Sequence, residues 1–294
     1  MTTDRHRIQR DGLSATIQAR GGEVVSLRDA QGREWLWQAG PEWRRHTPWL
    51  FPIVGRLAGD RLRHQGRDYR MTQHGFARDR RFTWVSQEPD RCRLRLSDDA
   101  ESRALYPFAF TLDLDFALAG GRLVARATVS NPGRAVLPFA FGAHPAFAWP
   151  LPGAGAGDAA KETHRLVFAQ PEPGPVLRLE GGLVAFEDSL PLRGRELPLS
   201  PALFARDAAI LPGVASRALR YVAEGGVALD MAWEGYRDLG LWSKPEGADF
   251  LCIEPWCGFS SPVGWDGEFL EKPGITLLKP GEKRDFTWSV MPQG

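Results

Sequence analysis

Apolar and polar residues alternate one by one through many short stretches of this chain. Between residues 111 and 118, apolar side chains occupy every even position and polar ones most of the others. The stretch 91–97 alternates in the same way. A repeat of two residues is typical of a β-strand with one face buried and the other exposed. The pair Gly120-Gly121 predicts a tight turn, and therefore an antiparallel hairpin between 111–118 and 122–131.

Further strand-like stretches recur along the chain, whereas the 3.6-residue period of helices is nearly absent. One short helix is predicted at 98–105, with Ser97 or Asp98 as its N-cap. The 32 glycines and 23 prolines lie mostly between the strand-like stretches, as the turns of a sheet protein require. These patterns predict an all-β protein built as a large antiparallel β-sandwich. The remaining predicted strands are 13–18, 82–87, 135–142, 164–169, 218–223, 227–232 and 284–291.

The chain shows no linker that would separate two self-sufficient hydrophobic patterns. We therefore expect residues 1–294 to form one domain, without internal repeats. The Gly- and Ala-rich stretch 150–160 follows His144 closely and is predicted to be a surface loop near a pocket.

Composition argues against several classes of function. The formal net charge of +1 gives no bias toward nucleic acid or an anionic membrane. No apolar run approaches 18 residues and the first 12 residues are polar, so neither a membrane span nor a secretion signal is expected. The cysteines, Cys92, Cys252 and Cys257, are few and odd in number, which favours a location in the reducing cytoplasm. We interpret Cys252 and Cys257 as buried thiols, because no further thiol or imidazole completes a metal site.

Two histidines and one glutamate each stand beside a residue that restricts or frees the backbone. These dipeptides are His74-Gly75, His144-Pro145 and Glu254-Pro255. Glycine permits close approach of the backbone, and proline biases the residue before it toward an extended conformation. Histidine and glutamate are the side chains best suited to proton transfer near neutral pH. The sequence therefore predicts proton-transfer chemistry.

Four segments around these residues resemble the aldose 1-epimerase (galactose mutarotase-like) family. They are 50–56, 73–78, 142–147 and 253–258, and they follow the family's order and approximate spacing. The resemblance extends from about residue 8 to about residue 290. The run His-Gly-Phe-Ala-Arg at 74–78 is most similar to the shorter branch of the family. Longer galactose mutarotases differ there, since their second histidine lies in an Asn-His sequence.

This resemblance implies a β-supersandwich that interconverts the α and β anomers of an aldohexose without a cofactor or metal. It implies that Glu254 is the general base that removes the proton of the C1 hydroxyl. His144 would be the general acid that protonates the ring oxygen as the C1–O5 bond breaks. His74 would hydrogen-bond the sugar near that oxygen, and Arg56 would hold its hydroxyl groups. Asp207 is the best positional match for a carboxylate that grips sugar hydroxyls. Trp256 or Phe147 would stack on the apolar face of the sugar.

Arginine is concentrated in one part of the sequence. Residues 44–81 contain ten arginines and three aspartates, a net charge of +7 within a nearly neutral chain. Arginine is suited to bidentate recognition of phosphate. We therefore hypothesise a phosphorylated hexose as an alternative substrate, with Arg78 as a candidate contact. The competing interpretation is a solvated arginine-rich face.

Two further interpretations stay open. The chain could be a non-catalytic carbohydrate-binding β-sandwich, because aromatic rings and arginines alone can bind sugars. It could also be a metal-dependent β-barrel enzyme, although the close His-x-His ligand pair usual there is missing. For the epimerase interpretation, the expected partner is a small sugar, free or phosphorylated, and the protein is expected to be a monomer or homodimer.

Overall fold

The computed structural model describes residues 4–172, 174–245 and 247–294, and most of its strands lie in two large antiparallel sheets. The larger contains nine strands within these residues, and the long strand β24 joins its two halves by pairing with β10 and β20. From one edge to the other, its strands are β17 (Glu196–Pro198), β14 (His164–Phe168), β19 (Ala218–Ala223), β20 (Ala228–Glu234), β24 (Lys283–Gln293), β10 (Arg122–Ser130), β9 (Thr111–Ala119), β8 (Arg91–Ser97) and β7 (Thr83–Gln87).

The second large sheet contains eight strands in the described part of the chain. Seven of them are, in order, β16 (Leu183–Asp188), β15 (Val176–Glu180), β18 (Ala209–Leu211), β21 (Asp238–Trp242), β22 (Phe250–Cys257), β12 (Phe141–Ala143) and β4 (Trp49–Leu50). The eighth, β13 (Ala146–Ala148), pairs with β22 beside β12. Strand β22 therefore has β21 along one edge and both β12 and β13 along the other.

Three smaller sheets and a few short helices complete the described residues. One sheet consists of β1 (Arg5–Arg10), β2 (Leu13–Gln18) and β3 (Val24–Arg28); the others pair β5 (Arg61–His64) with β6 (Arg67–Arg70) and β11 (Leu137–Phe139) with β23 (Thr276–Leu278). The helices are α1 (Ala100–Leu105), α2 (Gly157–Lys161) and the 3-10 turns η1 (Ala58–Asp60), η2 (Ala77–Asp79), η3 (Pro201–Phe204) and η4 (Phe269–Glu271). None of the helices described is long and apolar enough to cross a membrane.

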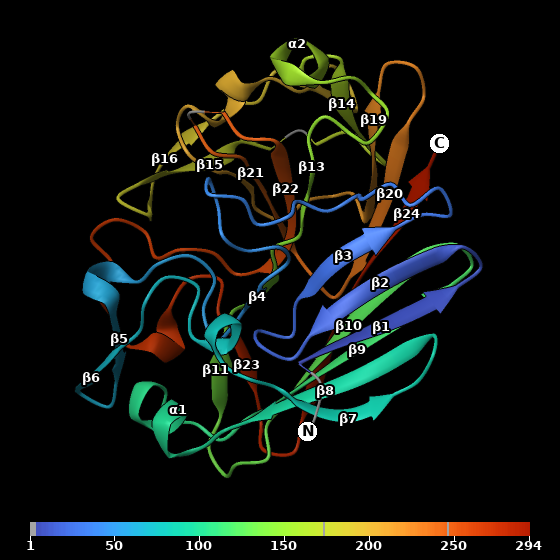
Figure 1. The fold of residues 1–294 in the computed structure, drawn as a ribbon. Coiled ribbons are helices and arrows are strands. Elements are labelled where there is room, and N and C mark those ends of the chain that lie inside the picture. The colour runs from blue at the N-terminus through green and yellow to red at the C-terminus, as the bar shows by residue number, and fades with distance from the viewer. Residues whose placement is uncertain (1–3, 173, 246) are drawn as a thin grey trace.

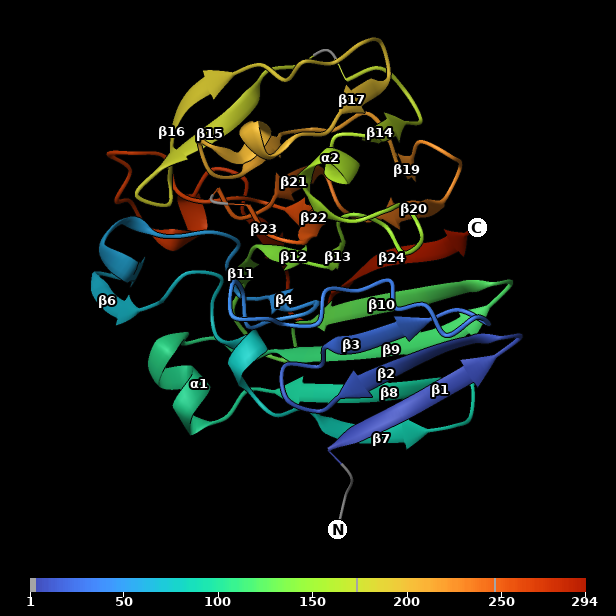
Figure 2. The ribbon, with the colours of Figure 1, turned by 45° about the horizontal axis from the view of Figure 1, so that its top comes forward.

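The sheets are layered around a continuous apolar core. Figures 1 and 2 show the sheet β1–β3 lying across the β7–β10 half of the nine-stranded sheet. The eight-stranded sheet lies beside the other half, near β14, β19 and β20. One cluster of buried side chains joins these layers, including Ile8 of β1, Phe116 of β9, Leu229 of β20 and Ile253 of β22. This is the antiparallel β-sandwich that the alternating pattern predicted, and that prediction is confirmed.

Most predicted strands coincide with observed ones to within two or three residues, including both strands of the hairpin around Gly120-Gly121. The stretch 135–142 was wrong as a single strand, because it divides into β11 and β12, which belong to different sheets. The helix begins at Ala100, after the N-cap Asp99 rather than Ser97 or Asp98. The Asp99 carboxylate accepts a hydrogen bond from the Ser102 N–H at 2.7 Å and the Ser102 hydroxyl accepts one from the Asp99 N–H at 2.8 Å. The stretch 150–160 is not wholly a loop, since α2 begins at Gly157.

Candidate active site

One cavity of about 270 Å³ collects most of the residues that the sequence singled out. Its volume lies just under the roughly 300–1,000 Å³ of common small-molecule pockets, so it suits one small ligand. It lies against the eight-stranded sheet, which supplies side chains from β15, β21 and β22, and loops supply the rest. The lining residues are Trp43, Gly55, Gln73, His74, Arg78, His144, Leu179, Asp207, Ala208, Trp242, Glu254, Trp256 and Ser260.

The strand pairing explains how His144 comes to face Glu254. Strand β12 pairs with the end of β22 at Trp256 and Cys257, and β13 pairs with its beginning at residues 250–252. The chain between β12 and β13, His144-Pro145, therefore passes β22 opposite Glu254. The Pro145 carbonyl oxygen accepts a hydrogen bond from the Ile253 N–H at 3.3 Å, which holds this crossing against the strand.

The two side chains are in direct contact at the bottom of the cavity. His144 Nε2 lies 3.2 Å from Glu254 Oε2, and the side chains are 7% and 1% exposed. Among the described residues, His144 Nδ1 has no hydrogen-bond partner. An imidazole and a carboxyl group at this distance can exchange a proton.

Burial sets the protonation of this pair. It raises the pKa of Glu254 well above its usual value; the Trp256 indole opposes the shift and the charge of Asp207 adds to it. Burial also lowers the pKa of His144 to about 3, and the positive charges of Arg78 and Arg45 act in the same direction. Burial therefore works against the carboxylate and the imidazolium that the roles of general base and general acid require. At this site, desolvation favours the neutral form of both side chains.

His74 lies beside His144, with ring centroids 5.6 Å apart. Its Nδ1 accepts a hydrogen bond from the Gly55 N–H at 3.1 Å, so its proton belongs on Nε2. Burial lowers the pKa of His74 well below its usual value, and the charge of Arg78 adds to this effect. His74 is therefore a neutral hydrogen-bond donor rather than a cation.

Backbone geometry around His74 depends on glycine. His74 itself has a φ of 66° and Gly75 a φ of 69°, both in the left-handed region. A Cβ at Gly75 would lie 2.2 Å from the carbonyl oxygen of Phe51. The close backbone approach expected at Gly75 is thus present, and no larger residue fits there.

Three tryptophans form the aromatic walls. Trp43 stacks on His144 with centroids 4.8 Å apart and an interplanar angle of 24°. Trp242 meets the His144 ring edge-on at 5.9 Å, and Trp256 also lines the cavity. Phe147, expected at the sugar, lies in the apolar core instead. The sequence did not indicate Trp43 or Trp242, because tryptophan is abundant in this chain and neither residue lies in one of the four segments that resemble the family.

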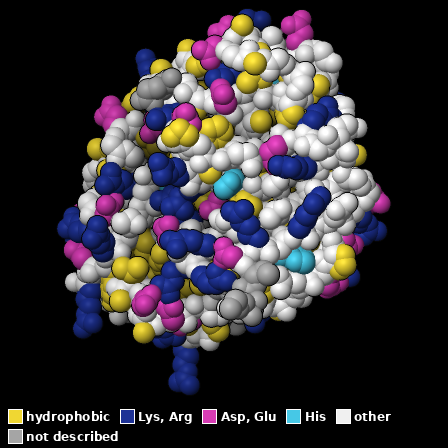
Figure 3. All heavy atoms as spheres, viewed as in Figure 1, with side chains coloured by type: hydrophobic (Ala, Val, Ile, Leu, Met, Phe, Trp, Pro, Cys, Tyr) yellow, Lys and Arg dark blue, Asp and Glu magenta, His cyan; other side chains and the backbone are white. Residues whose placement is uncertain are grey.

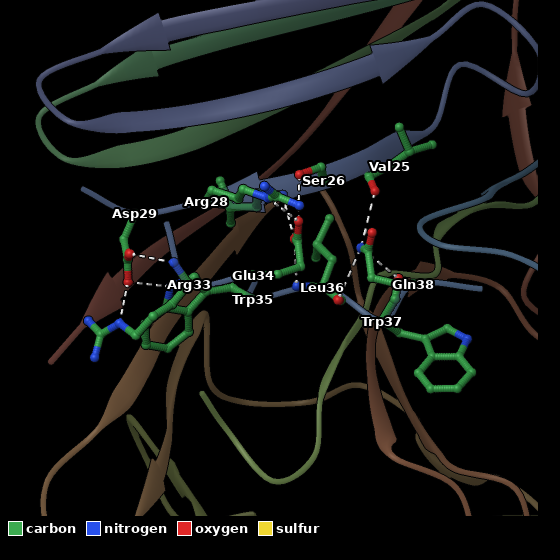
Figure 4. Close-up of polar contacts among 11 residues, drawn as sticks. Val25, Ser26, Arg28, Asp29, Arg33, Glu34, Trp35, Leu36, Trp37 and Gln38 are labelled. Atoms are coloured by element: carbon green, nitrogen blue, oxygen red, sulfur yellow. Dashed lines mark hydrogen bonds and ion pairs between the residues drawn. The ribbon is translucent and has the colours of Figure 1, made fainter. Parts of the chain in front are cut away.

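Trp43 is held in place by the segment that follows β3, shown in Figure 4. The Glu34 carboxylate accepts hydrogen bonds from the Ser26 hydroxyl at 2.5 Å and the Leu27 N–H at 2.8 Å, which fixes this segment to β3. Further along, the Trp37 indole donates to the Trp43 carbonyl oxygen at 2.8 Å. A chain of local hydrogen bonds therefore connects the sheet β1–β3 to the wall of the cavity.

Arg78 and Asp207 also line the cavity. The Arg78 side chain is 17% exposed, and its Nε has no hydrogen-bond partner in the described part of the chain. Burial lowers the pKa of Arg78 to about 10, with repulsion from Arg45 adding to it, so the group remains charged at neutral pH. Asp207 is exposed at a turn with φ 65°, and Arg178 fixes that turn by donating to the Asp207 carbonyl oxygen at 3.2 Å.

Arg56 does not line the cavity in this structure. Its Nε donates to Asp60 Oδ1 at 2.7 Å, and its Nη1 lies 3.4 Å from the Gly181 carbonyl oxygen. Asp60, four residues further along, satisfies the guanidinium and holds it toward solvent. A role for Arg56 at the sugar would require this ion pair to break.

The arginine-rich segment 44–81 contributes little free charge to the cavity. Figure 3 shows Lys and Arg side chains crowded over the part of this face where Figure 1 draws β5 and β6. Many of these side chains are paired; Arg45, for example, lies 2.9 Å from Asp79, and Arg63 lies 3.2 Å from Asp68. Among the arginines described, Arg78 is the one that lines the cavity.

One group of possible metal ligands lies at the same place. All three cysteines are free and buried, as predicted for Cys252 and Cys257. However, the fold brings an imidazole to Cys252, which the sequence analysis did not foresee. His144, Cys252 and Glu254 each offer a ligand atom, and these atoms lie within 4.8 Å of one another.

Comparisons with known proteins agree with the fold. A family model described as aldose 1-epimerase matches residues 4–170. The plasmid and chromosomal forms of the protein LacX of Lactococcus lactis subsp. lactis are 30% and 29% identical to this chain over 286 residues, which is 93% of this chain and 94% of theirs. A galactose mutarotase related enzyme from Lactobacillus acidophilus superposes with a TM-score of 0.91 at 27% identity, covering 99% of this chain and 97% of that one. A galactose mutarotase-like protein from Lactobacillus casei superposes with a TM-score of 0.90 at 26% identity, covering 98% and 100%.

Proposed function

Because this chain belongs to the aldose 1-epimerase family, we propose that it interconverts the α and β anomers of an aldohexose by general acid–base catalysis. The observation that carries the proposal is the 3.2 Å contact between His144 Nε2 and Glu254 Oε2 inside a cavity of small-ligand size. Ring opening needs one proton removed and one delivered, at two oxygens bound to the same carbon. A contacting acid and base match that requirement.

His144 and Glu254 share one transferable proton, which can be bound either to His144 or to Glu254. In the reactive form Glu254 is a carboxylate and His144 an imidazolium. The carboxylate takes the proton of the C1 hydroxyl, and the imidazolium gives its proton to the ring oxygen as the C1–O5 bond breaks. Both side chains are then neutral, which is the state that burial favours. Rotation about C1–C2 in the open aldehyde and the reverse transfers give the other anomer.

Neighbouring residues would position the sugar. His74 carries its proton on Nε2, because its Nδ1 accepts from the Gly55 N–H. This Nε2–H would donate to an oxygen of the substrate in place of its 3.4 Å contact with the Gln73 amide. Asp207 at the rim would accept hydrogen bonds from sugar hydroxyls, and Trp43, Trp242 or Trp256 would cover the apolar face of the ring. Arg56 would contribute only after leaving Asp60.

A phosphorylated aldose is the second candidate substrate, and Arg78 favours it. This guanidinium lines the cavity with its side chain 17% exposed, and desolvation together with repulsion from Arg45 lowers its pKa. Its Nη2 donates to the Gln73 carbonyl oxygen at 2.6 Å, whereas its Nε makes no hydrogen bond among the described residues and lies 4.0 Å from Asp79 Oδ2. A phosphate group would supply hydrogen-bond acceptors and negative charge there.

We further propose that the chain belongs to the shorter branch of the family, which has the motif at residues 74–78. We also propose that it forms a single domain and is located in the cytoplasm.

The proposal is tested by following anomerisation of freshly dissolved α-glucose, α-galactose and α-glucose 6-phosphate by polarimetry or NMR exchange. We expect equilibration faster than in buffer for at least one sugar. A strong preference for the phosphate ester that Arg78→Ala removes would identify the second substrate class. Sugar binding without acceleration of any of the three would contradict the proposal and identify a carbohydrate-binding protein.

A further inference from the structure

Cys252 lies directly beside the proposed catalytic pair. It precedes Glu254 by two residues on β22, and side chains two apart on a strand point to the same face. It is fully buried, and its sulfur lies within 4.8 Å of a ligand atom of both His144 and Glu254. Neither proton transfer step described above uses this thiol.

Polar atoms around the thiol lack partners. Among the described residues, His144 Nδ1 and Glu254 Oε2 have no conventional hydrogen bond, although Oε2 lies near the His144 ring. The Trp256 indole N–H lies close enough to Glu254 to oppose the rise that burial causes in the pKa of that carboxyl group, and as a donor it would not bind a cation. Buried polar atoms without partners are costly, and a bound group that contacts them would recover this cost.

We propose that Cys252, His144 and Glu254 form a binding site for a zinc-like divalent cation, which competes with the sugar for the cavity. A sulfur, an imidazole nitrogen and a carboxylate oxygen are the donor types that zinc takes in proteins. The metal-binding part stands on the cluster alone, whereas the competition with a sugar rests on the proposed function.

The geometry requires only a modest adjustment. Tetrahedral zinc with bonds of 2.0–2.3 Å needs ligand atoms about 3.4–3.6 Å apart, and the present separations reach 4.8 Å. Side-chain rotations that move the atoms by about 1 Å close this difference. The thiol loses its proton to solvent on coordination. His144 and Glu254 line the cavity, so a water molecule from the cavity would supply a fourth ligand.

The other cysteines provide matched controls. Cys257 lies on the same strand five residues away, and its sulfur contacts the Thr276 hydroxyl at 3.4 Å. It is as buried as Cys252, but it belongs to no group of possible metal ligands found in the described residues. A variant of Cys257 therefore changes a buried thiol of β22 without changing the proposed site.

Titration of the purified protein with Co²⁺, followed by absorption in the near ultraviolet, tests metal ligation without any turnover. We expect one equivalent of Co²⁺ to give a thiolate-to-cobalt charge-transfer band, and Zn²⁺ to displace it. Cys252→Ala should remove the band and weaken Zn²⁺ binding by at least about 100-fold, since outer-shell changes alone cost about 10–100-fold. Cys257→Ala should keep both. Cys252→Ser serves as a second variant if the alanine variant does not fold.

A wild-type protein without the band, or one whose band survives Cys252→Ala but not Cys257→Ala, would overturn the metal site. The competition is measured by calorimetric Zn²⁺ titration with and without a saturating sugar. Weaker zinc affinity in the presence of sugar is expected, and an unchanged affinity would overturn the competitive role. Because the cobalt band does not depend on catalysis, failure of the anomerisation assay leaves this result intact.

Discussion

The carboxylates of strands β9 and β22 differ in both their burial and their ion-pair partners. On β9, Asp113 and Asp115 stand directly opposite Arg95 and Arg93 of β8. Each arginine binds its aspartate through two nitrogens, at 2.6 and 2.9 Å for Asp113 and at 2.6 and 3.0 Å for Asp115. Glu254 on β22 is more deeply buried than either, at 1% exposure, and no arginine pairs with it among the described residues.

The difference separates a carboxylate that stabilises a fold from one that is available for chemistry. A paired, partly solvated aspartate stays ionised at a small cost in free energy, whereas ionising a buried carboxyl group that has no cation beside it costs much more. The fold places an imidazole rather than a guanidinium beside Glu254. An imidazole can take or give a proton near neutral pH, and a guanidinium cannot.

The comparison is tested most strongly by removing one carboxylate of each kind. Glu254→Gln should lower the rate of anomerisation by about 100- to 10,000-fold, the usual contribution of a positioned acid or base. Asp115→Asn should leave the rate unchanged, because Asp115 lies outside the cavity lining. Both rates are measured by NMR exchange with the preferred sugar. Retained turnover in Glu254→Gln would show that another residue is the base.

The pH dependence of stability should also distinguish Glu254. Its pKa is raised in the folded state, so the stability it contributes is present below the unfolded value of 4.5 and is lost as the pH rises toward the folded pKa. One proton corresponds to a slope of about 1.4 kcal/mol per pH unit. Urea unfolding of Glu254→Gln between pH 5 and 8 should therefore show stability rising with pH relative to the wild type. Parallel curves would mean that Glu254 is ionised in the folded protein.

The contribution of His144 to the pH dependence of stability should have the opposite sign to that of Glu254. Its pKa falls from 6.5 to about 3 on folding, so its stability contribution is present above pH 6.5 and is lost as the pH falls toward 3. Between pH 4.5 and 6.5 this slope opposes that of Glu254. His144→Asn should thus make stability fall with rising pH in that window, by up to about 1.4 kcal/mol per unit. His6→Asn, at a histidine of β1 outside the cavity lining, serves as the control, and an effect of equal size there would argue against a shared proton.

A smaller effect is expected from the aromatic wall. Trp43 stacks on His144 at 4.8 Å, and such aromatic pairs contribute about 0.5–1.5 kcal/mol. Trp43→Leu should therefore lower kcat/KM by roughly 2- to 10-fold. Trp84→Leu, in β7 and outside the cavity lining, should leave it unchanged. No loss in Trp43→Leu would show that the stacking does not support catalysis.

The same contrast explains what the sequence could predict. Strand β9 alternates because one of its faces meets arginines and solvent, so its limits were found almost to the residue. Strand β22 is buried along its whole length, and a strand buried on both faces has no alternation to detect. The strand that carries Glu254 was therefore not predicted as a strand.

At the site, the short motifs indicated His74, His144 and Glu254, and the structure brings these three together. What motifs could not give is contact between residues far apart in the chain. Trp43 is held against His144 by a hydrogen bond from Trp37, in the segment after β3. Cys252 lies beside His144 because β12 and β13, which flank His144, both pair with β22. The ion pair between Arg56 and Asp60 depends on the side-chain rotamer of Arg56, which a sequence motif does not predict.

The smallest predicted effect concerns the stability contributed by the arginine pairs themselves. The side chains of Arg93 and Asp115 are 45% and 33% exposed, and exposed ion pairs contribute about 0.2–1 kcal/mol. Asp115→Asn should lower the free energy of unfolding by that amount at low salt, and by less in 1 M NaCl, where charges are screened. Asp113 is more buried than Asp115, so Asp113→Asn should cost somewhat more. Urea unfolding at the two salt concentrations measures both. A loss of several kcal/mol in Asp115→Asn would mean that the β9 carboxylates are as sensitive to their surroundings as Glu254, and the distinction between the two strands would then rest on catalysis alone.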